Sequence, residues 1–237
     1  IEQLPYSSLI IDIDQFELIL LYIIIVAWLL FFIKKNYKRF VIAALCSIIF
    51  VFNITVKEYD RRKQQQFVVY NIEGYTALHF INGKKNALLS HKELFENEKK
   101  TLNYHVQNYW RYLGTEQPLA LGRKETYTTK KTVHLQDLPL QINRSFIRFG
   151  DKRIVHFNKF DPLFRYKSQK KITADYAVIS DNLDISIHDI LSLCTVELVI
   201  IDSSNNSSFV EKWINECRKE GINYYAVSQK GAFTVSM

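Results

Sequence analysis

The residues that could bind a charged ligand are concentrated in one segment, Arg144 to Lys171. This segment has nine bases and two acids, a local charge of +7 that equals the formal charge of the whole chain. Bases can follow a phosphate backbone, and aromatic rings can stack on nucleobases. The six rings interleaved with the bases are Phe146, Phe149, Phe157, Phe160, Phe164 and Tyr166. The segment therefore indicates a groove for single-stranded nucleic acid, with candidate contact residues Arg148, Phe149, Lys152, Arg153, Lys167, Lys170 and Lys171.

The same composition has a second interpretation. The segment could be an amphipathic hairpin whose rings lie in the core and whose bases are solvated or face anionic lipid headgroups. The charge excess alone does not distinguish nucleic acid from a membrane surface. Both interpretations stay open at the level of sequence.

Motifs for catalysis are missing from the sequence. The seven glycines are isolated, so there is no glycine-rich phosphate loop, and no serine has the glycine spacing of a nucleophile elbow. The loop from Asp202 to Asn205 follows an apolar run and is expected to cap the next helix. Cys194 and Cys217 are expected to be buried thiols, with a disulfide between them as the alternative in an oxidising compartment. We expect no catalytic residue and no cofactor.

Two uncharged apolar stretches indicate how the chain is anchored. Residues 18–33 and 40–56 carry no charged side chain, and the connector between them holds Lys34, Lys35, Lys38 and Arg39. Each stretch is slightly shorter than the roughly 20 residues that span a bilayer, and snorkelling ends can make up the difference. We predict two transmembrane helices, with a buried hairpin of a soluble protein as the alternative. Residues 1–17 form an extramembrane lead-in, and the opening Ile1 suggests a piece of a longer protein.

Beyond a basic linker at residues 57–66, residues 67–237 have the pattern of an α/β domain. Short apolar runs at 67–72, 76–81 and 85–90 predict three adjacent strands, with Asn82 and Gly83 as the turn between the last two. A helical spacing covers Lys92 to Leu113, and runs at 146–149 and 153–157 predict a second hairpin. Strands at 176–180, 197–202, 224–228 and 232–236 alternate with two helices, for which Ser186 and Ser208 are the expected capping residues, and this order predicts a parallel layer. Residues 115–137 have no clear pattern.

This order of elements resembles a known family. The segments VVYNIEGYTALHFINGKKNALLS and ISDN, followed by ELVIIDSSN, are similar to the C-terminal part of the ComEC family, inner-membrane channel proteins of competence DNA uptake. The resemblance implies a metallo-β-lactamase-like domain. Its first strand would lead into a turn rich in glycine and acids, where this chain has Asn71, Ile72, Glu73, Gly74, Tyr75 and Thr76.

The resemblance also locates the positions where such a domain would hold metal. Hydrolases of that fold place a His-x-His-x-Asp-His cluster after a buried strand, because two water-activating cations need several ligands from one loop. The matching positions here are Asp181, Leu183, Ile185 and Ser186, and three of these four are poor ligands. We therefore expect a degenerate metal site and no nuclease or phosphodiesterase activity.

Together these features predict a membrane α-helical hairpin followed by an α/β domain of metallo-β-lactamase-like layout without metal ligands. The resemblance implies a bacterial inner-membrane, multi-pass channel for single-stranded DNA, with the α/β domain on the periplasmic side. Because the metal-ligand positions are replaced, we expect this domain to be non-catalytic and to guide or gate the DNA. Its partners would be the bilayer, upstream channel helices of the same longer protein and other competence proteins. The alternatives are a membrane-anchored binding or scaffold domain unrelated to DNA and a membrane-tethered phosphodiesterase whose metal site is built from other residues.

Overall fold

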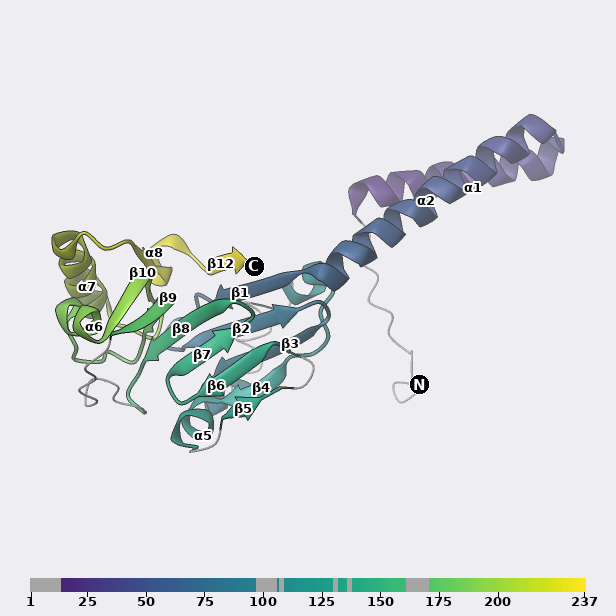
Figure 1. Cartoon of the computed structure of the whole chain (residues 1–237). Coiled ribbons are helices and arrows are strands. Elements are labelled where there is room, and N and C mark those ends of the chain that lie inside the picture. The colour runs from purple at the N-terminus through teal and green to yellow at the C-terminus, as the bar shows by residue number, and fades with distance from the viewer. Residues whose placement is uncertain (1–13, 97–105, 107–108, 130–131, 136–137, 161–170) are drawn as a thin grey trace. The chain divides into compact units, whose positions relative to one another are not determined.

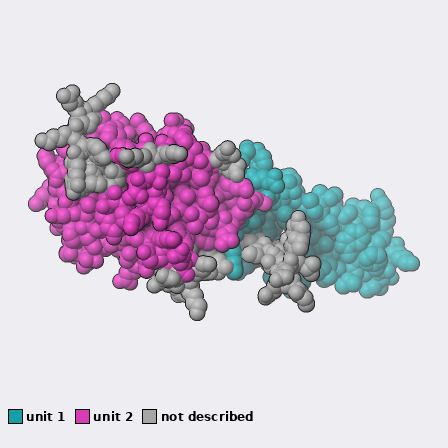
Figure 2. Space-filling view, turned by 90° about the horizontal axis from the view of Figure 1, so that it is seen from below, with its two compact units in different colours: residues 1–63, 111–114 teal, residues 64–110, 115–237 magenta. Residues whose placement is uncertain are grey.

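The computed structural model describes residues 14–96, 106, 109–129, 132–135, 138–160 and 171–237. Its contacts divide the chain into two compact units (Figures 1 and 2). The helical unit comprises residues 1–63 and 111–114, and the α/β unit comprises residues 64–110 and 115–237.

The helical unit contains two long apolar helices, α1 (Gln15–Lys34) and α2 (Tyr37–Lys63). Both are long and apolar enough to cross a membrane, and large apolar side chains such as Ile33 and Phe52 are 74% and 68% exposed. The prediction of two apolar helices is confirmed, and each helix extends beyond its predicted range. Most of the segment expected to be a linker is helical, because α2 continues through Lys63.

Polar contacts fix the register of α1 against α2. Asp14 and Glu17 form a capping box at the start of α1, and Nζ of Lys57 on α2 lies 3.3 Å from Glu17 Oε2 and 3.7 Å from Asp14 Oδ2. Nearer the connector, the indole N–H of Trp28 donates to Ser47 Oγ at 3.3 Å. These contacts join the helices at two levels along their length.

The α/β unit is built on two sheets. The first has the order β12-β1-β2-β3-β4, comprising Phe233–Ser236, Gln65–Val69, Ala77–Asn82, Lys85–Ser90 and Leu119–Gly122. The second has the order β11-β10-β9-β8-β7-β6-β5, comprising Tyr224–Ala226, Cys194–Ile201, Ile172–Ile179, Lys152–Phe157, Phe146–Phe149, Leu140–Asn143 and Val133–His134. Strands β8 to β11 are parallel, whereas β5 to β8 are antiparallel.

The two sheets pack face to face around an apolar core. Phe67 on β1 stacks on Phe80 with ring centroids 5.2 Å apart, and Phe149 on β7 meets Phe80 at 5.4 Å. All three rings are fully buried. Burying large aromatic side chains is strongly favourable, so this core holds the sheets together.

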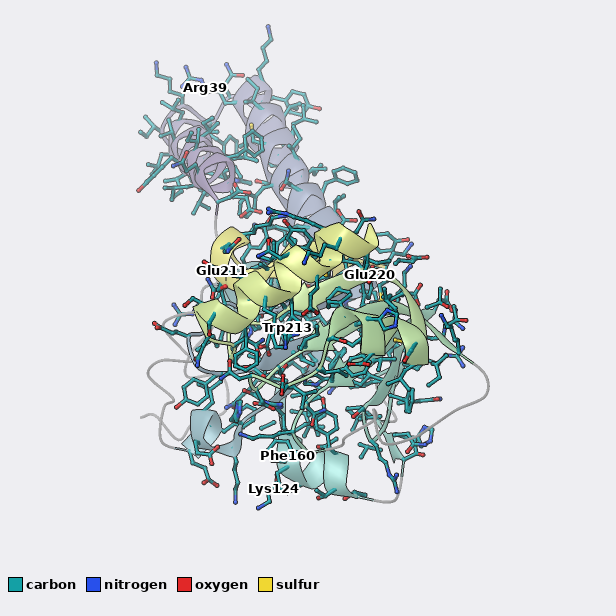
Figure 3. The ribbon with its side chains drawn as sticks, turned by 90° about the vertical axis from the view of Figure 1, so that its left-hand side faces the viewer. Arg39, Lys124, Phe160, Glu211, Trp213 and Glu220 are labelled. Atoms are coloured by element: carbon teal, nitrogen blue, oxygen red, sulfur yellow. The ribbon has the colours of Figure 1, made fainter. Side chains whose placement is uncertain are left out.

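A second core lies between the seven-stranded sheet and the helices α6 (Ile187–Leu193) and α7 (Ser207–Glu220). Trp213 of α7 is fully buried, and its indole N–H donates to the carbonyl of Ile185 at 2.8 Å. Figure 3 shows Trp213 beneath α7, whereas Glu211 and Glu220 lie along the outer side of that helix. Three further helices whose bounds the structure describes in full are short, namely α3 (Lys92–Glu96), α5 (Arg123–Thr128) and α8 (Val227–Lys230).

The structure confirms both predicted hairpins and corrects details of them. Asn82 pairs with Lys85, so the turn residues are Gly83 and Lys84 rather than Asn82 and Gly83. Gly83 has φ of 61°, which glycine adopts without strain. The hairpin of β7 and β8 turns at Gly150 and Asp151, since Phe149 pairs with Lys152.

The parallel layer is confirmed for β9, β10 and β11, while its C-terminal part differs from the prediction. The strand predicted at 224–228 ends at Ala226, where α8 follows, and β12 pairs with β1 in the other sheet. The N-cap of α7 is Asn206 rather than Ser208. Of the helix predicted over Lys92 to Leu113, α3, Val106 and residues 109–113 are helical, and residues 97–105 and 107–108 lie outside the described residues.

Candidate functional site

Polar side chains gather where four strands of the α/β unit end. His91 follows β3, Arg123 follows β4, Lys159 and Phe160 follow β8, and Asp181 follows β9. We call these five residues the strand-end cluster. Parallel strands bring their carboxyl ends to one edge of a sheet, which is where α/β folds commonly place sites.

The strand-end cluster is centred on a buried ion pair between Arg123 and Asp181. Nη2 and Nη1 of Arg123 donate to Oδ2 and Oδ1 of Asp181 at 2.5 and 3.2 Å. Their side chains are 1% and 4% exposed. The two parallel contacts match the planar fork of a guanidinium to a carboxylate.

Further groups surround this ion pair. Nε2 of His91 lies 3.0 Å from Arg123 Nη1 and 3.6 Å from Asp181 Oδ1, and Lys159 Nζ lies 4.0 Å from Asp181 Oδ1. The Arg123 guanidinium lies over the ring of Phe160 at 5.5 Å. Figure 3 shows Phe160 beside α5, from which Lys124 extends outward.

Electrostatics keep Asp181 ionised. Burial by itself would raise the pKa of Asp181, but hydrogen bonds from His91 and Arg123 and the positive charge of Arg123 outweigh it. The net effect holds the pKa of this carboxyl well below its usual range. Asp181 is therefore an anion that is already neutralised by protein cations.

Behind the ion pair, a hydrogen-bonded chain joins β8, β9 and β10. The Tyr127 hydroxyl is hydrogen-bonded to His156 Nδ1, His156 Nε2 lies 2.7 Å from Ser180 Oγ, and Ser180 Oγ donates to Asp202 Oδ2 at 2.6 Å. Burial, together with the charge of Arg123, holds the pKa of His156 well below its usual value, and burial raises the pKa of Asp202.

These hydrogen-bonded side chains include the serine, histidine and aspartate of a hydrolase triad, but they are not arranged as a triad. His156, Ser180 and Asp202 are each fully buried, and the Ser180 hydroxyl bonds to Asp202 and His156 at once. A nucleophilic serine must reach a substrate while a base takes its proton. We therefore interpret this hydrogen-bonded series as structural: it links the ends of β8, β9 and β10 through Tyr127, His156, Ser180 and Asp202.

The four positions that the resemblance marked for metal have other roles. Asp181 is paired with Arg123, Leu183 packs against the core beneath α6 and α7, and Ile185 is buried in that core. Ser186 is the N-cap of α6 and forms a capping box with Asp189. In the part of the chain that the structure describes, no group of three or more His, Cys, Asp or Glu side chains could hold a metal ion. The donor set at these positions does not fit a metal centre.

The turn from Asn71 to Thr76 contacts the loop after β10. Ser203 Oγ accepts from the Ile72 backbone N–H at 3.0 Å, and the Gly74 N–H donates to the Ser203 carbonyl at 3.1 Å. Residues of both segments, with Ser207 and Ser228, line a polar pocket of 760 Å³. Asp202 and Asn205 bond to each other and to residues at the end of β9, since Asp202 accepts from Ser180 and Asn205 donates to the Ile179 carbonyl, so they join this loop to the end of β9.

A second polar region lies on the seven-stranded sheet, on the face that the apolar core between the sheets leaves uncovered. A groove of 420 Å³ runs across β5 to β9 there. None of the helices labelled in Figure 1 lies over β6 and β7 on this face. We call the following groove residues the open sheet face: His134, Gln141, Asn143, Phe146, Arg148, Arg153 and Thr173.

The structure separates the predicted nucleic-acid contacts into groups. Arg148 and Arg153 lie together on the open sheet face, directly opposite each other on β7 and β8. Lys171 is exposed just before β9, and Lys152 is held by Asp175 at 3.2 Å. Lys167 and Lys170 lie outside the described residues.

The prediction that Phe149 stacks on a nucleobase is wrong. Its side chain is fully buried between the two sheets and packs against Phe80. The physical reason is the alternation along β7, in which Ile147 and Phe149 face the core and Phe146 and Arg148 face outward. The ring on the open sheet face is Phe146.

Two residues of the strand-end cluster, Arg123 and His91, were not predicted from the sequence. Arg123 lies in the stretch without a clear pattern, and its carboxylate partner is 58 positions away along the chain. His91 was one of several scattered histidines. The expected thiols are present, since Cys46, Cys194 and Cys217 are all free, and the alternative disulfide between Cys194 and Cys217 is wrong.

Comparison with known proteins gives one finding and two negative results. A family profile described as the ComEC C-terminal domain matches residues 67–237, which is nearly all of the α/β unit and most of the chain. Neither the curated proteins nor the solved structures contain a match. The match begins within β1 and ends at the C-terminus, so it includes the strand-end cluster and the open sheet face. The chain therefore belongs to the ComEC family of competence DNA-uptake proteins, of which it contains the C-terminal domain.

Proposed function

We propose that this chain is the non-catalytic C-terminal part of an inner-membrane channel for single-stranded DNA, where its α/β unit guides or gates the incoming strand. Family membership and the two apolar helices support DNA uptake in a membrane context. The main observation in favour of a non-catalytic domain is the ion pair of Arg123 and Asp181. The cation beside the Asp181 carboxylate at the strand ends is the protein's own guanidinium.

The layout supports descent from a metallo-β-lactamase-like domain. Two sheets pack face to face, and α6 and α7 cover the outer face of one of them. The outer face of the other sheet contacts helical residues, since the Trp110 indole donates to the Tyr70 hydroxyl at 3.1 Å and its ring lies 5.9 Å from His79. Helices on both outer faces of a sheet pair are the layering expected for that fold.

The chemistry at the strand ends supports loss of catalysis. Hydrolysis through two metals needs several ligands around water that the metals activate. Here the retained carboxylate of Asp181 is saturated by Arg123, and the neighbouring positions hold Leu183 and Ile185. The cluster stabilises the fold and has no free base next to an open coordination site.

We place the α/β unit on the periplasmic side by its resemblance to the family. At the end of α2, Lys57 is paired with Glu17, and Arg62 is paired with Glu58 at 3.1 Å. The end of α2 also carries Arg61 and Lys63, so it holds four bases, as the connector does. The positive-inside rule counts bases rather than net charge, so the two ends are equivalent by that rule and the periplasmic assignment rests on the family resemblance.

This orientation is tested by labelling in intact spheroplasts. A membrane-impermeant maleimide should label a cysteine introduced at Lys219, which is exposed on α7, and should not label one introduced at Lys35. Labelling of the Lys35 position alone would reverse the orientation.

The non-catalytic function is tested on the full chain in detergent. We expect purified protein to hold no stoichiometric zinc or manganese, a chelator to leave its melting temperature unchanged, and no cleavage of DNA in the presence of added divalent metal. A metal required for folding would couple to stability. Metal-dependent nuclease activity that disappears in Asp181→Asn would contradict the proposal.

A further inference from the structure

The open sheet face holds two like charges in an unfavourable position. Arg148 and Arg153 are directly opposite in the antiparallel pair of β7 and β8, and both side chains are exposed. Like charges at directly opposite positions destabilise a sheet. Two guanidinium groups placed there are suited to an anion that bridges or follows them.

Nearby protein groups leave this positive charge largely available. Arg148 donates from Nε to the Gly150 carbonyl at 3.3 Å, a neutral acceptor. Arg153 lies 4.0 Å from Asp175 Oδ2, but Asp175 is already bonded to Lys152 at 3.2 Å. Asp175 is therefore shared by two bases, Lys152 and Arg153, while Arg148 contacts a neutral carbonyl, so the local charge stays positive.

The rest of the groove has groups suited to a nucleotide chain. Phe146 lies beside Arg148 on the same face, lines the groove and is partly buried against the core beneath α6 and α7. Gln141, Asn143 and Thr173 are exposed and can donate and accept hydrogen bonds. A groove that crosses five strands extends over about 19 Å, since neighbouring strands lie about 4.8 Å apart.

We propose that the open sheet face binds single-stranded DNA, with Arg148 and Arg153 on backbone phosphates and Phe146 stacked on a base. This inference rests on the proposed function and assigns DNA binding to one surface of the α/β unit. Charge complementarity and the groove-lining ring of Phe146 identify the occupant, because phosphates satisfy the arginine pair and an unpaired base presents a π-face to the ring. A lipid headgroup shares the phosphate but offers nothing for the ring.

The test measures fluorescence anisotropy of a labelled oligothymidylate of about 16 nucleotides with the full chain in neutral detergent. The variants are Arg148→Gln, Arg153→Gln and Phe146→Leu, and Lys124→Gln is the matched control because Lys124 is an exposed base on α5. We expect each arginine variant to weaken binding about tenfold, as for the loss of a charge-assisted hydrogen bond. Phe146→Leu should weaken it about fivefold, as for the loss of one stacked base.

Two further measurements separate the explanations. Melting temperatures establish that the variants are folded, and the arginine variants should melt at or slightly above the wild-type temperature. Titration with a short-chain phosphatidylglycerol provides the lipid arm. We expect Phe146→Leu to leave lipid binding unchanged.

The outcomes are distinguishable. If the wild-type chain binds DNA and the face variants bind equally well, the inference is overturned while the proposed function stands. If the wild-type chain binds no DNA even at low salt, both are overturned. Arginine variants that lose phosphatidylglycerol binding but keep DNA binding would make the face a lipid surface and overturn the inference.

Discussion

Arginine has opposite environments in the two polar regions of the α/β unit. In the strand-end cluster, Arg123 is 1% exposed and forms a bidentate pair with Asp181. On the open sheet face, Arg148 and Arg153 are exposed and face each other. The charge of Arg123 is neutralised by a carboxylate of the protein, whereas the charges of Arg148 and Arg153 are largely not.

This difference separates stability from binding. A buried guanidinium with a carboxylate partner is costly to disrupt, because removing one partner leaves an uncompensated buried charge. Exposed arginines that repel each other contribute nothing favourable to the fold, so their charge is available to a ligand. Substitutions in the two regions should therefore have opposite signatures.

The largest expected effect is that of Arg123→Ala. It leaves Asp181 buried without its main cation, and breaking a buried pair in this way costs about 3 to 5 kcal/mol of unfolding free energy. Urea denaturation followed by tryptophan fluorescence measures the change. Lys124→Ala, at the exposed neighbouring position, should change stability by less than about 0.5 kcal/mol. Equal stabilities of the two variants would mean that the buried ion pair of Arg123 and Asp181 does not stabilise the fold.

A comparable loss is expected for Phe149→Ala, although this residue adjoins the open sheet face in sequence. Truncating a buried phenylalanine costs about 3 to 5 kcal/mol through lost burial and the cavity left behind. The same denaturation experiment measures it. Any variant protein that remains folded should bind single-stranded DNA as the wild type does. Loss of DNA binding in a Phe149→Ala variant as stable as the wild type would mean that Phe149 contacts the DNA.

Acid should weaken the α/β unit in two steps. His79 is fully buried, and burial lowers its pKa to about 4, so the unfolded state binds a proton more readily below pH 6.5. The free energy of unfolding should fall as the pH decreases from about 6.5 to 4, and His156 acts in the same direction. His79→Gln should flatten this part of the profile, whereas a wild-type stability that does not change over this range would refute the argument.

The second step belongs to Asp181. Its pKa is held low in the folded state, so its contribution is complete above the unfolded value of about 3.9 and declines as the pH falls below it. The stability difference between wild type and Asp181→Asn should therefore be constant from pH 5 to 7 and shrink in stronger acid. Equilibrium unfolding at several pH values measures this difference. A stability difference that grows in acid would contradict a lowered pKa of Asp181 in the folded state.

The smallest expected effect is the most specific to the open sheet face. Arg148→Gln removes a cross-strand repulsion and should leave stability unchanged or raise it by about 0.2 to 1 kcal/mol. The measurement is a urea midpoint beside that of Lys124→Gln. A loss of more than about 1 kcal/mol would mean that Arg148 is a structural residue.

The sequence allowed the hairpins, the apolar helices and the parallel layer to be predicted, because each depends on local periodicity or a turn residue such as Gly83. It did not reveal that β12 joins the first sheet, since its pairing with β1 joins the two ends of the domain. In β7 the order Phe146, Ile147, Arg148, Phe149 places a ring on each face, so periodicity could not decide which ring is exposed. Arg123 was missed for a related reason, because a buried ion pair between distant segments has no local pattern.

The salt dependence of single-stranded DNA binding tests the central claim most directly. For single strands, the slope of log affinity against log salt is about −0.7 for each phosphate contact. The double variant Arg148→Gln, Arg153→Gln should therefore have a slope about 1.4 shallower than the wild type, and Lys124→Gln should keep the wild-type slope. A double variant whose slope equals that of the wild type would contradict the assignment of DNA binding to the open sheet face.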